Sequence, residues 1–149
     1  MPYFPDRRIE GAGPYASEYF MRLAAAAATI DSAAITAAGE LIARTVAAGR
    51  RIYSCGNGGS AAIANHLVCD CLKGIRTDTA IRPKVYSLST TVETITAIVN
   101  DIGSEQMFSF QLESLGEAGD LLIAISSSGA SPNIVRTLEL ARTLGMGTI

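Results

Sequence analysis

The stretch SCGNGGSAAIANH, residues 54–66, decides how this chain is interpreted. It continues a short segment, 51–55, that is typical of a β-strand, and it places three glycines, an asparagine and a serine at the end of that strand. Ordered glycine costs backbone entropy, so such a cluster at a strand-to-helix junction indicates that another group approaches the main chain closely there. The residues that follow are expected to form a helix, 60–72, which carries the only histidine of the protein, His66.

Outside this stretch, helix and strand patterns alternate along the chain. The expected helices are 15–30, 33–48, 60–72, 92–99, 105–115 and 132–144, and the expected strands are 51–55, 84–88 and 121–125, with another beginning at 147. Asp31 or Ser32 is expected to cap the second helix, while Gly49 and Gly74 are expected to end the helices before them. Strands that alternate with helices predict an α/β fold with a parallel sheet and right-handed crossovers.

The domain organisation is expected to be simple. Residues 1–14 are interpreted as an N-terminal arm and 15–149 as a single domain. Within this domain, two alanine-rich helices over 15–48 precede an α/β core over 50–149. Because a strand that starts at residue 147 has no reason to stop there, the core is expected to be incomplete, with its C-terminal βα elements missing.

Composition excludes several classes of protein. The chain has 149 residues, of which 48% are hydrophobic and 17% charged, and its net charge is −2, as in soluble globular domains. No run of lysine and arginine supports direct nucleic-acid binding, and no apolar run approaches the roughly 20 residues of a membrane span. Three cysteines without a CxxC motif, Cys55, Cys69 and Cys71, fit a reducing compartment. We therefore expect a cytoplasmic protein that contacts neither membrane nor nucleic acid.

A second unusual loop, SSSGASPN over 126–133, follows the apolar strand 121–125. Ser131 occupies the expected N-cap of the next helix and Pro132 its first position. Ligands of open α/β sheets bind outside the carboxyl ends of the strands, and hydroxyls around a helix N-terminus bind anions without any lysine. The loop therefore predicts a phosphate monoester site, although serine and glycine also occur in ordinary turns.

The glycine stretch does not fit a nucleotide cofactor. Gly56, Gly58 and Ala61 match GxGxxA, but the next strand lacks the acidic residue of a dinucleotide site, and no GK[ST] follows the glycines. His66 and Asp70 share a helix face, which is consistent with proton transfer, with metal binding or with a purely structural histidine. Cys69 lies near that face and would either join His66 at a metal or pack in the core, and the core is favoured because free cysteine is often buried.

Together SCGNGGS with His66 behind it, Asn100-Asp101, and ISSSGASPN resemble the SIS (sugar isomerase) domain. Within that family they resemble the phosphoheptose, or sedoheptulose 7-phosphate, isomerases. The resemblance covers about residues 15–149. It implies a flavodoxin-like three-layer sandwich whose N-terminal helices build a homotetramer, with active sites at the subunit interfaces.

The resemblance also implies roles for individual residues. His66 matches a histidine that binds zinc, one ion per subunit, in metal-containing members. Asp70 stands where the family has a glutamate that is both catalytic acid/base and metal ligand. A glutamine and a histidine on the last helix of the family have no counterpart. The remaining matches are to phosphate-binding residues (Ser126, Ser127, Ser128 and Ser131) and to residues that meet the sugar (Asn57, Gly58, Gly59, Ser60 and Asp101).

The implied reaction converts sedoheptulose 7-phosphate into glycero-manno-heptose 7-phosphate through an enediol, for surface polysaccharide synthesis. Asp70 is one methylene shorter than glutamate, and a misplacement of about 1 Å can cost ~100-fold in rate. Two alternatives therefore stay open. One is a non-catalytic SIS module that binds phosphosugars or protein partners, as the replication-initiator-associating proteins do. The other is a SIS protein for another sugar phosphate, such as a hexosamine phosphate.

Overall fold

The computed structural model describes residues 4–149, and these form two compact units that divide between residues 37 and 38. In the first unit, helix α1 (Ala12–Ala27) begins after Gly11, because the positive φ of Gly11 (86°) is not a helical conformation. The helix therefore lies three residues earlier than the expected 15–30. Of the expected arm, residues 1–3 lie outside the described part. Residues 12–14 of the arm belong to α1 itself, and the segment before the helix contacts it through an ion pair between Asp6 and Arg22 (3.0 Å).

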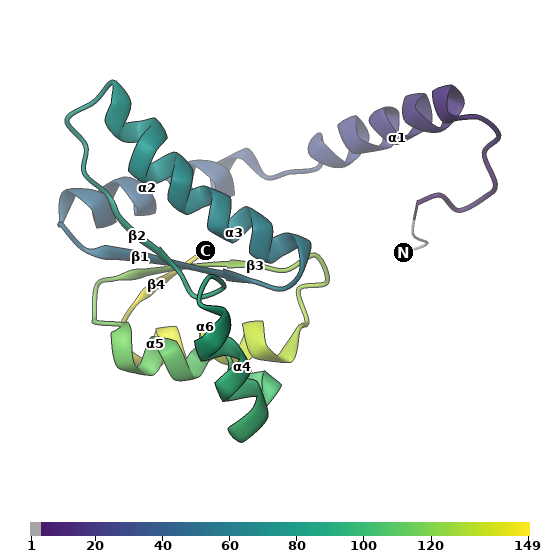
Figure 1. The fold of residues 1–149 in the computed structure, drawn as a ribbon. Coiled ribbons are helices and arrows are strands. Elements are labelled where there is room, and N and C mark those ends of the chain that lie inside the picture. Colours follow the sequence, from purple (N-terminus) through teal and green to yellow (C-terminus); the bar gives the residue numbers. More distant parts are fainter. Residues whose placement is uncertain (1–3) are drawn as a thin grey trace. The chain divides into compact units, whose positions relative to one another are not determined.

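The second unit is built on a four-stranded parallel sheet. The strands are β1 (Arg51–Gly56), β2 (Lys84–Ser87), β3 (Leu121–Ile125) and β4 (Gly147–Thr148), in the order β2-β1-β3-β4. Every neighbouring pair is parallel, and in the β1–β3 pair Gly56 lies opposite Ile125. The carboxyl ends of β1 and β3 are therefore adjacent. This sheet confirms the predicted flavodoxin-like α/β fold (Figure 1).

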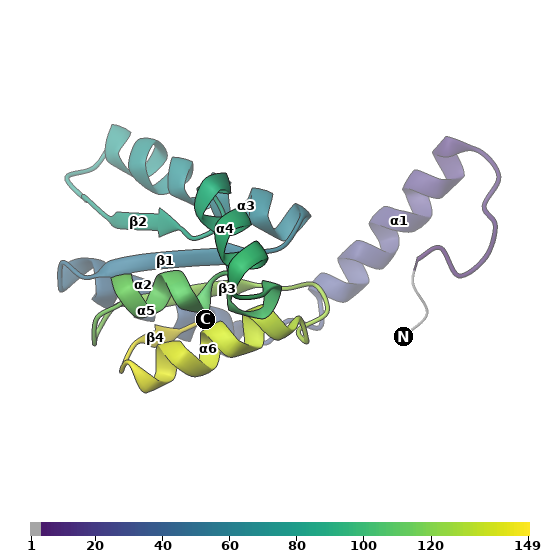
Figure 2. The same ribbon diagram turned by 60° about the horizontal axis from the view of Figure 1, so that its bottom comes forward.

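Helices cover both faces of the sheet, as Figures 1 and 2 show. Residues of α2 from Leu41 onward and of α3 pack over one face, against Ile52, Val85 and Leu121. Helices α5 and α6 cover the other face, around Phe108 and Leu122. The bounds are α2 (Ser32–Ala47), α3 (Gly59–Cys69), α4 (Val92–Asp101), α5 (Ser109–Leu115) and α6 (Pro132–Thr143), with a π-helical turn at Asp70–Ile75 and a 3₁₀ turn at Ser104–Gln106.

Several local expectations are confirmed. Asp31 caps α2 by accepting a hydrogen bond from the backbone N–H of Ala33 (2.9 Å). Gly49 follows α2 with a φ of 66°, the left-handed conformation that ends helices. Pro132 opens α6 directly after Ser131, whose backbone is extended.

Two helix expectations are wrong. Gly74 does not end a helix, because α3 widens at Asp70 into the π-helical turn and Gly74 lies inside that turn, which continues to Ile75. The expected helix 105–115 is broken into the 3₁₀ turn and α5, and the fully buried Phe108 lies between them. No single helix within residues 4–149 is long and apolar enough to cross a membrane. Only α1 and α2 together reach that length and composition, and the chain is broken between them.

Candidate functional site

The glycine loop, residues 56–60, makes a tight turn at the end of β1. A Cβ added at Gly56 would lie 2.6 Å from the backbone of Ser60, so the group that approaches this glycine closely is the loop itself. Nothing lies within 4 Å of a Cβ added at Gly58 or Gly59, which leaves their main chain open. Gly58 also has a φ of 52°, which favours glycine. The loop thus exposes backbone at its tip.

Ser89, two residues after the end of β2, holds the base of this loop. The Gly56 N–H donates to Ser89 Oγ (3.2 Å), and that hydroxyl donates to the Gly56 carbonyl (3.0 Å). Below the loop Cys55 is fully buried, and burial raises the pKa of its thiol to about 12. The strand end is therefore fixed and chemically inert, while the loop tip is accessible.

The serine loop, residues 126–131, gathers three hydroxyls at the start of α6. The Oγ atoms of Ser126, Ser128 and Ser131 lie 3.3–3.4 Å from one another. The backbone N–H groups of Gly129 and Ala130 donate to two of these hydroxyls, at 3.1 and 3.2 Å. Each hydroxyl can donate one hydrogen bond to an incoming anion, because hydroxyl protons rotate freely. The loop is open to solvent, with 127–130 exposed, so Ser127 is accessible as well.

The glycine loop is bonded to the first turn of α6, the helix that directly follows the serine loop. Asn57 Nδ2 donates to Asn133 Oδ1 (3.0 Å), and Asn133 Nδ2 donates to Asn57 Oδ1 (2.9 Å). This pair, with the β1–β3 register, brings together most of the residues expected to bind phosphate and sugar: Asn57, Gly58, Gly59, Ser60, Ser126, Ser127, Ser128 and Ser131. The side-chain amide of Asn57 is therefore already hydrogen-bonded to Asn133.

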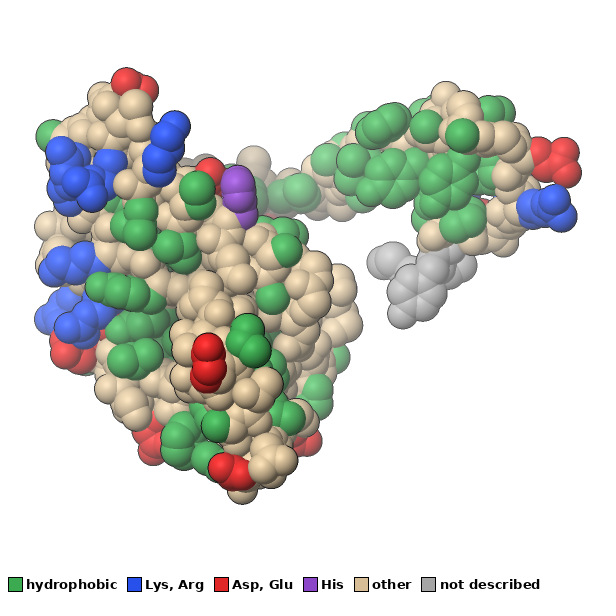
Figure 3. All heavy atoms as spheres, in the orientation of Figure 1, with side chains coloured by type: hydrophobic (Ala, Val, Ile, Leu, Met, Phe, Trp, Pro, Cys, Tyr) green, Lys and Arg blue, Asp and Glu red, His purple; other side chains and the backbone are tan. Residues whose placement is uncertain are grey.

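His66 and Asp70 lie farther along α3. His66 Nε2 is 3.4 Å from Asp70 Oδ1, and both side chains are largely exposed. They line an open cavity of about 480 Å³ whose other walls are Ala62, Ile63 and Leu67. The histidine stands at the molecular surface (Figure 3). An exposed pair of this kind can exchange a proton with a bound molecule.

This pair alone does not make a metal site. Zinc in proteins takes three or four protein ligands, and residues 4–149 contain no group of three His, Cys, Asp or Glu side chains that could hold an ion. Cys69 does not supply a third ligand. The expectation that it packs in the core is also wrong, because Cys69 is exposed and the buried cysteines are Cys55 and Cys71.

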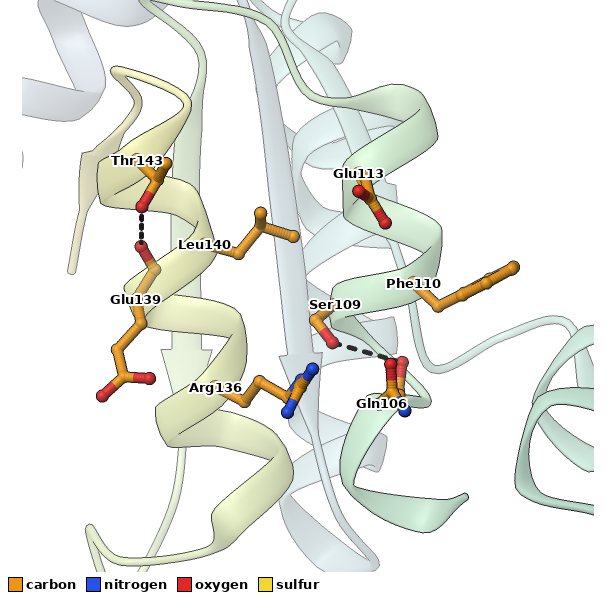
Figure 4. A pocket seen from close by; sticks show the side chains of 8 residues that line it. All are labelled: Gln106, Ser109, Phe110, Glu113, Arg136, Glu139, Leu140 and Thr143. Atoms are coloured by element: carbon orange, nitrogen blue, oxygen red, sulfur yellow. Dashed lines mark hydrogen bonds between the residues drawn. The ribbon is translucent and has the colours of Figure 1, made fainter. Parts of the chain in front are cut away.

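Asp101 is not brought to the loops by any interaction found in the described residues. It is the last residue of α4, is exposed, and accepts a hydrogen bond from Asn100 Nδ2 (2.6 Å). A groove of about 390 Å³ between α5 and α6 is also separate from both loops. Arg136 and Leu140 project into it from α6 (Figure 4).

Sequence reasoning missed Ser89 and Asn133. Ser89 had a local signal, because it follows β2 at the same edge of the sheet as the glycine loop. Asn133 had only its position in the first turn of α6, since its partner Asn57 lies 76 residues away.

Comparison with known proteins places this architecture in a family. The SIS domain model matches residues 15–149, so the chain belongs to the SIS domain family. Two relatives, both named phosphoheptose isomerase, come from Desulfovibrio desulfuricans (46% identical) and Akkermansia muciniphila (41% identical). The matches cover 72% and 89% of this chain but 51% and 67% of the relatives, so the chain spans about half the length of the first and two thirds of the second.

Solved structures agree with this assignment. The phosphoheptose isomerase GmhA of Neisseria gonorrhoeae superposes with a TM-score of 0.82 at 30% identity, over 93% of this chain and 73% of that one. A phosphoheptose isomerase from Francisella tularensis gives a TM-score of 0.80, with the same identity and coverage. The likeness therefore extends over almost all of the described fold.

Proposed function

We propose that this protein is an aldose–ketose isomerase that converts sedoheptulose 7-phosphate into glycero-manno-heptose 7-phosphate, in the cytoplasm, for surface polysaccharide synthesis. The observation that carries the proposal is the convergence of three serine hydroxyls at the N-terminus of α6, beside an open glycine loop. The names of the relatives and of both solved structures support the substrate class.

In this proposal the two loops bind and Asp70 reacts. Ser126, Ser127, Ser128 and Ser131 hold the phosphate with hydroxyl donors and with the dipole of α6. The open main chain of Gly58 and Gly59, with Ser60, lies against the sugar. Asp101 is proposed to approach the same sugar from the end of α4.

Isomerisation needs a base that removes the proton next to the carbonyl and returns it to the neighbouring carbon of the enediol. Asp70 is the proposed base, and His66, 3.4 Å away, orients its carboxylate and exchanges the proton. Residues 4–149 of a single chain offer zinc no third ligand at this pair, so no step is assigned to a metal.

The position of Asp70 supports a site shared between subunits. Eleven residues separate Asp70 from Gly59 at the start of α3, which is about 16 Å along a helix. An extended seven-carbon sugar phosphate is shorter than that. A homotetramer in which α3 of one subunit faces the loops of another would remove this gap, and light scattering of the purified chain tests for it.

The activity test is incubation of the protein with sedoheptulose 7-phosphate, with and without zinc, while aldose formation is followed. We expect turnover that Asp70→Asn abolishes and that Asp78→Asn, a change of another exposed aspartate, leaves intact. Retained phosphosugar binding without turnover in the wild type would contradict the proposed enzyme. That result would favour the binding module.

A longer carboxylate sharpens the same test. Asp70→Glu adds one methylene and restores the side chain that the family resemblance implies. We expect the reaction to be faster by about 10- to 100-fold, because moving a catalytic group by about 1 Å changes the rate by a factor of that size. A slower reaction would mean that the site is already built around aspartate.

A further inference from the structure

Asn133 contacts the glycine loop from the opposite side to Ser89. Its amide exchanges two hydrogen bonds with Asn57, and its Nδ2 also lies 3.1 Å from Met107 Sδ. The side chain is therefore anchored on α6 and against the segment before α5. Asn133 is only 8% exposed, whereas Asn57 is exposed, so the buried member of the pair is the fixed one.

The hydrogen bonds define which way each amide points. Asn133 Oδ1 accepts from Asn57 Nδ2 and also from the backbone N–H of Ile134 (3.0 Å). Its nitrogen is thus directed to Asn57 Oδ1 and to Met107. After pairing, Asn57 keeps one N–H and one lone pair for another partner.

This pair links the glycine loop to the helix that follows the serine loop. Asn133 lies in the first turn of α6, two residues after Ser131. Asn57 is one residue after Gly56, which Ser89 holds from the β2 side. The glycine loop is thereby held on both flanks. If the pair were broken, the glycine loop could move relative to the serine loop without disturbing the three hydroxyls.

We propose that Asn133 is a positioning residue, which sets the separation between the phosphate-binding serines and the glycine loop by pairing with Asn57. This inference rests on the proposed function, because the separation matters only if one molecule spans both loops. The phosphate would then bind normally in the absence of the pair, while the sugar would be misplaced. Misplacement of the order of 1 Å reduces a rate by about 100-fold.

The test compares Asn133→Ala, Asn57→Ala and the double variant with wild type, and Glu139→Gln on the exposed side of α6 serves as control. We expect each single variant to lower kcat about 10- to 100-fold and to change the affinity for inorganic phosphate by less than about 2-fold. Because both changes remove one interaction, the double variant should lose no more than the worse single variant.

If Asn133→Ala fails to fold, Asn57→Ala still tests the proposal, because Asn57 is exposed and its replacement should leave the fold intact. Phosphate affinity that falls as far as kcat would overturn the proposal by placing Asn133 in the anion site. Full additivity of the two changes, or unchanged kcat, would also overturn it.

Amide hydrogen exchange separates this inference from the proposed function. The Ser60 N–H donates to the Asn57 carbonyl (2.9 Å), so loss of the pair should accelerate exchange at Ser60 and Ala61 at least several-fold, whether or not the wild type turns over sugar. Unchanged exchange in Asn57→Ala and Asn133→Ala would show that the pair does not hold the loop.

Discussion

The carboxyl ends of the strands and their amino ends, called here the carboxyl edge and the amino edge of the sheet, use opposite chemistry. At the carboxyl edge, the glycine and serine loops present hydroxyls and backbone amides, and neither loop contains a charged residue. At the amino edge, Asp120 is 1% exposed and accepts hydrogen bonds from the backbone N–H groups of Arg51 (2.9 Å) and Glu117 (3.1 Å). Arg51 Nη1 also pairs with Glu117 Oε1 (3.1 Å).

The two edges differ in role: the amino edge stabilises the fold, and the carboxyl edge is available to bind a ligand. A buried carboxylate is stable only when its lost hydration is replaced, and Asp120 achieves this with two N–H donors that fix the starts of β1 and β3. The serine hydroxyls are bonded mainly to one another and remain at the surface. We therefore expect substitutions at the amino edge to change stability and most substitutions at the carboxyl edge to change binding.

The largest expected effect is an exception to this rule, because Gly56 lies at the carboxyl edge but is needed for the fold. Gly56→Ala places a methyl group 2.6 Å from the Ser60 backbone and should lower the free energy of unfolding by about 3 kcal/mol, measured by urea denaturation. Gly59→Ala is the matched control, since nothing lies within 4 Å of its added Cβ, and should change stability by less than about 0.5 kcal/mol. Equal effects would contradict the described close approach.

Asp120→Asn tests the amino edge. The replacement amide can accept only one of the two hydrogen bonds and turns an N–H₂ group toward the other donor, so we expect a loss of about 2 kcal/mol in unfolding free energy. Phosphate affinity of the folded protein, measured by calorimetry, should stay within about 2-fold. A large loss of affinity would show that the two edges are coupled.

Ser128→Ala tests the carboxyl edge. Loss of one donor from the hydroxyl cluster should weaken phosphate binding by about 10-fold or more, because a hydrogen bond to a charged group contributes roughly 1.5–3 kcal/mol, and should leave the thermal midpoint almost unchanged. Ser114→Ala, an exposed serine on α5, provides the control. Binding equal to wild type would remove the serine cluster from the proposed site.

The smallest effect concerns the cysteines. Cys69 is exposed, whereas burial raises the pKa of Cys55 to about 12, so the Cys55 thiol stays protonated at neutral pH. Iodoacetamide should therefore modify Cys69 first in the folded protein and Cys55 only after unfolding, as peptide mass spectrometry would show. Modification of Cys55 in the native state would mean that the strand end below the glycine loop opens.

Local signals in the sequence were enough for most of the fold and for both loops. A helix start or end is determined by the residues at that terminus. This holds for Asp31 at the start of α2, Gly49 after its end, and Ser131-Pro132 at the start of α6. The expectation for Cys69 was wrong because it rested on how often free cysteine is buried, whereas Cys69 is exposed, as His66 and Asp70 are.

Long-range pairs were out of reach of pattern reasoning. Asp120 and Arg51 are 69 residues apart, and Asn57 and Asn133 are 76 apart, so nothing in either local stretch indicates the partner.

The neutral character of the serine loop also bears on how quickly an anion is captured. No ammonium or guanidinium group belongs to either loop, and the protein as a whole carries a net charge of −2. Long-range attraction therefore contributes little to the approach of a phosphate ester, and the association rate constant should hardly change between low and physiological ionic strength.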